Sequence, residues 1–176
     1  YAYHANGRLS DITNPTSTET FDYDDQANLI AHSRILAGQE YTTGYNYHTN
    51  GLLKTKTLPD GTQLNHHYYG QKGQPHKHQG RLRAITRAGL IVDDTIVGEI
   101  NYNSLGQITS LTHGNGITSS YLYDKTTLVG IEHSNGPALY YQYENGRITG
   151  IAQVTHTKDE RRAGTETGNR TVIPDQ

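Results

Sequence analysis

The stretch Tyr1-Ala-Tyr3-His-Ala-Asn-Gly7-Arg8-Leu9-Ser-Asp-Ile12 opens the chain and holds the pattern that decides its fold. Aromatic side chains two residues apart point to one face of a strand, because side chains alternate along an extended backbone. The Asn-Gly pair that follows supplies residues that tolerate positive φ in a short turn. Leu9 and Ile12 then begin a returning strand. The stretch therefore predicts one β-hairpin.

The same pattern recurs along most of the chain. A pair consisting of a ring or apolar residue and, two positions later, a tyrosine occurs in seven units, mostly 20–24 residues apart. The second members of these pairs are Tyr3, Tyr23, Tyr47, Tyr69, Tyr102, Tyr123 and Tyr143. A turn glycine follows in five units, at Gly7, Gly51, Gly80, Gly106 and Gly146. Internal repetition of this kind predicts a stack of hairpins that pair with their neighbours.

One unit is longer than the others. After Tyr69 the Gly-Arg-Leu-x-x-Ile sequence arrives late, as residues 80–85, and it closely matches residues 7–12. We therefore place an insertion of about seven residues within 70–79. Residues 1–154 are predicted to form an array of about seven repeats, and residues 155–176 a flexible tail or a truncated further repeat.

Composition favours the same fold. Only 33 of the 176 residues are Leu, Ile, Val or Phe, whereas there are 14 Tyr and 19 Gly, and the net charge is -2. Each glycine would cost a helix about 1 kcal/mol. We predict a soluble all-β chain of tandem β-hairpin repeats in a long, twisted antiparallel sheet. No run of about 18 apolar residues predicts membrane insertion, and the balanced charge gives no reason to expect a nucleic-acid partner.

Several units resemble the YD repeats of the RHS family, with relatives in teneurins and in the shell-forming subunits of Tc-type toxins. The segments that carry the resemblance are Tyr1-Ala-Tyr3-His-Ala-Asn-Gly7-Arg8-Leu9, Phe21-Asp-Tyr23-Asp24 and Tyr121-Leu-Tyr123-Asp124. The resemblance covers about residues 1–154 and implies an arc of an RHS-type β-shell. In that family the shell encloses a toxic domain or supports adhesion. The Asp-Pro-x-Gly-like motif of self-processing members does not occur in the sequence, so autoproteolysis is not implied.

Ten histidines make a metal site an alternative to weigh. His66 adjoins a tyrosine strand, and His76 and His78 alternate within the insertion, so His66, His76 and His78 are the candidate ligands. Solvated or packing histidines are the favoured interpretation, and no cofactor is predicted. No Gly-x-Ser-x-Gly elbow and no cysteine occur, so no catalytic residue is predicted.

A basic stretch offers a candidate ligand surface. Arg81, Arg83 and Arg87 are two and four residues apart, so on a regular strand they could share one face. Such a face could bind anionic glycans, with tyrosines as stacking partners. A solvated strand face is the favoured interpretation.

These patterns lead to one principal hypothesis and two alternatives. The principal one is a non-catalytic structural segment of a secreted or cell-surface RHS-repeat shell that encapsulates a toxin cargo or builds a surface scaffold. Its expected partners are the remaining repeats or domains of a larger parent protein, a toxin cargo or a surface glycan. The alternatives are a carbohydrate-binding surface adhesin and a metal-dependent hydrolase.

Overall fold

The computed structural model describes residues 1–70, 76–89, 93–155 and 169–173. It divides into two units, Tyr1–Thr95 and Ile96–Gln176, and each is described by itself. The described residues form fifteen strands and no helix, so the prediction of an all-β chain of antiparallel hairpins is confirmed. Accordingly, this part of the chain holds no helix that is long and apolar enough to cross a membrane.

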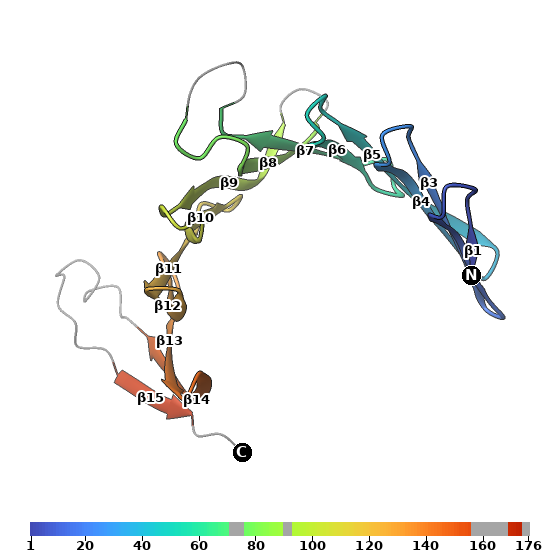
Figure 1. Ribbon diagram of the computed structural model, residues 1–176. Coiled ribbons are helices and arrows are strands. Elements are labelled where there is room, and N and C mark those ends of the chain that lie inside the picture. The colour runs from blue at the N-terminus through green and yellow to red at the C-terminus, as the bar shows by residue number, and fades with distance from the viewer. Residues whose placement is uncertain (71–75, 90–92, 156–168, 174–176) are drawn as a thin grey trace. The chain divides into compact units, whose positions relative to one another are not determined.

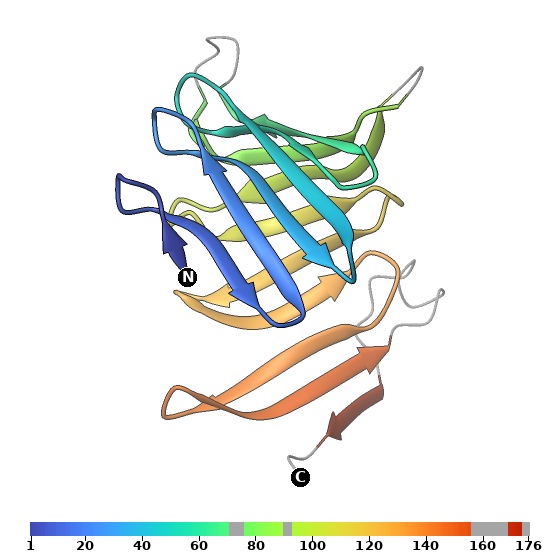
Figure 2. The same cartoon turned by 90° about the vertical axis from the view of Figure 1, so that its right-hand side faces the viewer.

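The N-terminal unit is an antiparallel meander in which each strand pairs with the next one along the chain (Figure 1). Its strands are β1 (Ala2–Tyr3), β2 (Leu9–Asn14), β3 (Ser17–Tyr23), β4 (Leu29–Leu36), β5 (Gln39–Tyr47), β6 (Leu53–Thr57), β7 (Gln63–Tyr68) and β8 (Leu82–Arg87). Figure 2 shows the strands of this unit twisting relative to one another, from dark blue to green. Successive connections alternate between the two ends of the strands, so the turns form two rows.

The C-terminal unit has the same arrangement. Its strands are β9 (Asp94–Tyr102), which begins two residues before the unit, β10 (Ile108–His113), β11 (Thr118–Asp124), β12 (Thr127–His133), β13 (Ala138–Glu144), β14 (Arg147–Thr155) and β15 (Asn169–Ile173). In the predicted tail, residues 169–173 form β15, which pairs antiparallel with β14. Residues 156–168 and 174–176 of that tail lie outside the described residues.

A β-bulge follows every repeat tyrosine at the same place. In the third repeat Tyr47 lies opposite Leu53, but its neighbour Asn46 lies opposite Thr55. Lys54 is therefore an extra residue with no pairing partner on β5. The corresponding extra residues are Ser10, Ile30, Lys54, Arg83, Thr109, Val129 and Thr149. Each bulge shifts the side-chain alternation of the returning strand by one residue and increases the local twist.

The register corrects one repeat position and shows that one repeat is shorter. In the fourth repeat Tyr68, rather than Tyr69, lies opposite the leucine before the bulge, Leu82. Tyr69 instead begins the turn, where its N–H donates to the Arg81 carbonyl (2.9 Å). In the sixth repeat Tyr123 lies opposite Leu128, so the connection is one residue shorter than in the third repeat, where Tyr47 lies opposite Leu53.

The hydroxyls of several repeat tyrosines tie successive hairpins together. Tyr47 Oη donates to the carbonyl of Leu29, one repeat earlier, at 2.8 Å. Tyr68 and Tyr143 make the same bond, each at 2.8 Å, to the carbonyls of Leu53 and Leu128. This shared contact identifies Tyr68 as the equivalent of Tyr47 and Tyr143.

Burial is shallow in both units, which fits the small number of Leu, Ile, Val and Phe residues in the sequence. The buried apolar residues are Tyr69 and Ala84 in the N-terminal unit and Ile100, Ala138, Ala152 and Val154 in the C-terminal unit. Cross-strand pairs supply further packing: the rings of Phe21 and His32 lie directly opposite each other and stack, with centroids 4.6 Å apart.

Candidate functional site

The turns after the repeat tyrosines position the candidate site. In the third repeat the His48 N–H donates to the Leu52 carbonyl (2.8 Å), and the Gly51 N–H donates to the His48 carbonyl (2.9 Å). The same pair of bonds closes the turns that begin at His4, Asp24, Tyr69 and Asn103. The predicted turn glycines all lie in the left-handed region, with φ of +81° at Gly7, +79° at Gly51, +80° at Gly80, +86° at Gly106 and +77° at Gly146.

The second turn is held by a carboxylate. Asp24 Oδ1 accepts hydrogen bonds from the N–H groups of Gln26 (3.0 Å) and Asn28 (2.8 Å), and Oδ2 accepts one from the Asn28 side chain (3.0 Å). These bonds, with the one from the Asn28 side chain foremost, lower the pKa of Asp24. The Asp24 carboxylate is therefore charged at neutral pH and occupied by its own turn.

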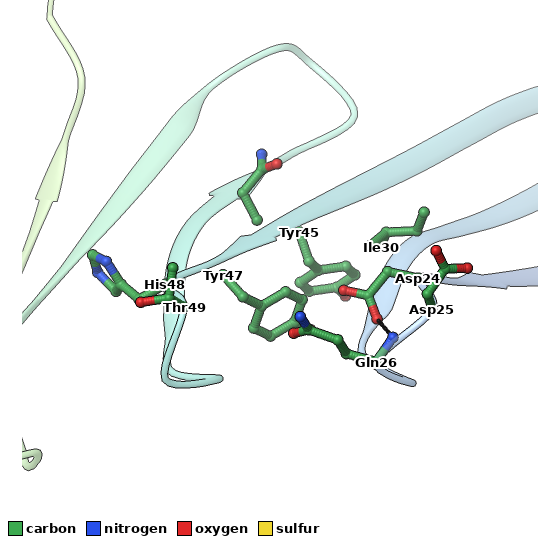
Figure 3. Close-up of a pocket in the computed structure, with 9 residues that line it drawn as sticks. Asp24, Asp25, Gln26, Ile30, Tyr45, Tyr47, His48 and Thr49 are labelled. Carbon is green, nitrogen blue, oxygen red and sulfur yellow. Dashed lines mark hydrogen bonds between the residues drawn. The ribbon is translucent and has the colours of Figure 1, made fainter.

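A hollow of about 430 Å³ lies between the second and third turns (Figure 3). Its lining residues are Asp24, Asp25, Gln26, Ile30, Tyr45, Asn46, Tyr47, His48 and Thr49. Figure 3 shows the rings of Tyr45 and Tyr47 beside the side chains of Asp24 and Gln26. The hydrogen bond of Tyr47 to Leu29 fixes one ring, and burial, with smaller effects of Tyr45 and Asp24, raises the pKa of Tyr47. We call this volume the second-turn hollow.

The polar groups of the second-turn hollow are largely unengaged. Within the part of the chain that the structure describes, the side chains of Asp25 and Gln26 and the Tyr45 hydroxyl make no hydrogen bond. The side chain of Asn46, which lies between Tyr45 and Tyr47 on β5, points to the opposite face of the strand. Gln26 contributes only its backbone N–H to the turn. The hollow thus offers hydrogen-bond acceptors and donors beside two aromatic rings.

A neighbouring hollow of about 320 Å³ has the same position in the first repeat but different chemistry. It is lined by His4, Ala5, Asn6 and Tyr23. His4 Nε2 donates to the Phe21 carbonyl at 2.9 Å, and its ring meets the Tyr23 ring edge-on, with centroids 5.8 Å apart. The Arg8 guanidinium lies 5.6 Å from the centre of the Tyr23 ring. In this first-turn hollow the polar groups and the ring are already engaged within the protein.

Of the three candidate metal ligands, the structure brings His76 and His78 together, with ring centroids 5.5 Å apart, but it does not add His66 to them. His66 lies in β7, where its Nδ1 is buried without a hydrogen-bond partner and burial lowers its pKa. His76 stacks on Tyr69 with centroids 4.2 Å apart, and its Nδ1 accepts the His78 N–H at 3.1 Å. Among the described residues, no three His, Asp or Glu side chains are placed to hold a metal ion.

The candidate arginine surface does not form a single row. Arg81 precedes β8, Arg83 is the extra residue of the bulge, and Arg87 ends the strand. The bulge breaks the two-residue alternation on which a shared face depended. Arg87 also pairs with Asp94, with Nη2 and Oδ2 2.5 Å apart. The bulge thus interrupts the regular strand face that the three arginines could have shared, whereas a ligand surface at these residues stays a prediction. Five residues of the adjoining insertion, 71–75, lie outside the described residues.

A polar cluster in the C-terminal unit was not foreseen from the sequence. The hydroxyl of Ser119, whose residue is 2% exposed, hydrogen-bonds to His113 Nε2 and to His133 Nδ1, each at 2.9 Å. The three residues come from β10, β11 and β12. The buried Ser119 hydroxyl thus links the three adjacent strands through its two hydrogen bonds.

Comparison with known proteins places the fold. No protein-family model and no curated protein matches the chain. Among solved structures, the Tc holotoxin pore of Photorhabdus luminescens matches 84% of the chain at 18% identity, with a TM-score of 0.65. The TcdB2-TccC3 complex with Cdc42 matches 86% at 17% identity, with a TM-score of 0.67. The chain spans about 8% of the length of each of these solved chains.

These matches are structures of Tc toxins, one of the groups that the YD-repeat resemblance named as relatives. The prediction of an RHS/YD-type fold is therefore confirmed. TcdB2-TccC3 without its hypervariable C-terminal region also matches, over 86% of the chain with a TM-score of 0.67, so that region is not needed for the likeness.

Proposed function

We propose that the chain is a non-catalytic structural segment of an RHS-repeat shell, in a secreted or cell-surface protein, that encloses a toxin cargo or forms a scaffold. The observation that carries this proposal is the uninterrupted strand order of each unit, combined with a likeness to about 8% of much larger toxin chains. A short stretch of hairpins that recurs inside a long chain is suited to building a wall. Further repeats of the parent protein are its proposed partners.

The chemistry of the described residues supports a structural role. The Ser–His contacts of the C-terminal unit involve a buried serine, and the histidines of the insertion stack on Tyr69 or bind each other. These side chains serve packing and strand pairing. The hydrogen bonds from Tyr47, Tyr68 and Tyr143 to the preceding repeat likewise hold successive hairpins in place.

The test is a structure of the full-length gene product by electron cryomicroscopy, together with limited proteolysis. We expect further hairpins to continue the strand order of both units and a segment inside the wall to resist protease. Thr55→Pro, in the middle of β6 between two paired strands, should open the wall and expose that segment. The control Ala5→Pro, in an exposed turn, should leave it protected. A product whose repeats form a separate open domain would contradict the proposal.

A further inference from the structure

We propose that the second-turn hollow binds an uncharged saccharide. The observation that motivates this is the coexistence of two tyrosine rings and unengaged polar side chains around one volume. Ligand sites of about 300–1,000 Å³ commonly combine apolar or aromatic walls with a few convergent polar groups. A volume of about 430 Å³ falls within this range and suits one or two sugar rings.

The tyrosine rings provide the surface on which a sugar ring can pack. Tyr45 and Tyr47 are two residues apart on β5, so both rings lie on one face of the strand. The Tyr47 hydroxyl is held by the Leu29 carbonyl, and its ring therefore needs little ordering when a ligand binds. The C–H face of a sugar is apolar and its edge carries hydroxyls, which matches rings bordered by polar groups.

The polar groups match a ligand that both donates and accepts hydrogen bonds. The Asp25 carboxylate accepts, and the Gln26 amide and the Tyr45 hydroxyl each donate and accept. None of these groups is used by the described part of the protein. Sugar hydroxyls likewise donate and accept, so each lining group has a complementary partner on a saccharide.

Charge selects against anionic ligands. Asp24 and Asp25 bring two carboxylates to the hollow, whereas Lys56 Nζ lies 5.9 Å from the centre of the Tyr45 ring. Two carboxylates beside one ammonium group disfavour phosphodiesters and sulfated glycans. The second-turn hollow therefore differs in location and in charge from the basic stretch at Arg81–Arg87, which is the candidate surface for anionic glycans.

The first-turn hollow provides the contrast. There His4 and Arg8 engage Tyr23, and Asn6 Oδ1 accepts the Arg8 N–H at 3.1 Å. A ligand would have to displace these contacts. The two hollows have the same turn geometry, so the difference in binding is expected to come from the side chains of the second turn alone.

The experiment is saturation-transfer NMR on the full 176-residue chain, with a panel of neutral monosaccharides and disaccharides at millimolar concentration. We expect signal transfer to at least one neutral sugar, with a shift of the Gln26 side-chain amide on titration. The double variant Asp25→Ala, Gln26→Ala should weaken that binding about tenfold, the effect of losing one or two hydrogen bonds. Ser104→Ala, Leu105→Ala, at the same positions of the Asn103 turn, should bind as the unaltered chain does.

Three results would overturn the proposal. The first is no transfer to any neutral sugar. The second is binding that leaves the Gln26 side-chain amide unshifted, a measurement on the unaltered chain that holds even if the variant does not fold. The third is preferential binding of an oligonucleotide or a sulfated glycan that shifts this same amide.

Discussion

The first three repeats and the last two close their hairpins differently but share one bulge. The turns after Tyr3, Tyr23 and Tyr47 are long and carry two backbone hydrogen bonds. The last two repeats use two-residue turns, between Asp124 and Thr127 and between Glu144 and Arg147. The bulge nevertheless follows the tyrosine in every repeat. The tyrosine and the bulge therefore set the register, and the turn is free to vary in length.

The largest effect on stability is expected at a strand glycine of the C-terminal unit, because neighbouring side chains pack more closely over it than over a strand glycine of the N-terminal unit. A Cβ at Gly130 in the C-terminal unit would lie 2.9 Å from Tyr140 Cδ1, whereas one at Gly44 in the N-terminal unit would lie 3.7 Å from Thr57 Cβ. Gly130→Ala should lower the free energy of unfolding by about 1–3 kcal/mol through overpacking. Gly44→Ala should change it by about 0.5 kcal/mol or less. Urea denaturation of both variants measures this, and equal effects would contradict the difference.

A comparable loss is expected at the buried serine of the C-terminal unit. Ser119→Ala removes the partner of both His113 and His133 and should cost about 1–3 kcal/mol in urea denaturation. Ser33 provides the control in the N-terminal unit, because its hydroxyl pairs with that of Thr42 in an exposed position. Ser33→Ala should cost about 0.5 kcal/mol or less. A similar cost for both would show that burial does not decide the effect.

The shared tyrosine bond should have the same strength in both units. Tyr47→Phe and Tyr143→Phe each remove one hydroxyl that donates to a carbonyl of the previous repeat. Each should cost about 0.5–1.5 kcal/mol by thermal or urea unfolding. Tyr45→Phe, whose hydroxyl makes no hydrogen bond among the described residues, should be near neutral. A large cost at one of the first two positions only would mean that the turn type also affects this bond.

A smaller gain is expected in the second turn. Ala27 has a φ of +78° where the third turn has Gly51 at +79°. The left-handed region is strained for alanine and open to glycine, so Ala27→Gly should raise stability by about 0.5–1 kcal/mol. The reverse change, Gly51→Ala, should lower it by a similar amount. Opposite signs in unfolding experiments are the expected outcome, and equal signs would exclude backbone strain as the cause.

The smallest effect concerns pH. Burial lowers the pKa of His66 in the folded state, so the unfolded chain binds the proton more readily. Stability should therefore fall as the pH drops below the ordinary histidine value of about 6.5, and level off below the lowered pKa. His66→Gln should reduce this loss between neutral and mildly acidic pH, relative to the same change at the exposed His4. An unchanged pH profile would show that His66 does not contribute.

The hairpins could be predicted from the sequence because turn-forming residues and a tyrosine pair can be recognised in most repeats. It could not predict the bulge, because the extra residue is serine, isoleucine, lysine or arginine in successive long-turn repeats. The sequence alone does not show whether Tyr68 or Tyr69 occupies the repeat position, because two adjacent tyrosines fit the same pattern. Only the hydrogen bond to Leu53 and the register opposite Leu82 distinguish them.

The second-turn hollow could not be predicted from the sequence either. Its lining comes from the turns that begin at Asp24 and His48, and its character depends on which polar groups are already engaged. Asp24 and Asp25 are adjacent carboxylates, yet the first holds its turn and the second makes no hydrogen bond among the described residues. The turn-capping role of Asp24 could have been predicted, because Asp24 is the first residue of a turn. The sequence could not show that the Asp25 carboxylate makes no hydrogen bond among the described residues.

The turn that begins at Tyr69 has a practical consequence. Its N–H bonds to Arg81 and its carbonyl accepts the Gly80 N–H, as in the uninterrupted turns, although ten residues separate Tyr69 from Gly80 where two separate His48 from Gly51. The strands on either side keep the common register. This position is therefore suited to protein engineering: a foreign peptide grafted between Gly70 and His76 would be displayed at the end of a hairpin that keeps both closing hydrogen bonds and the stacking of His76 on Tyr69.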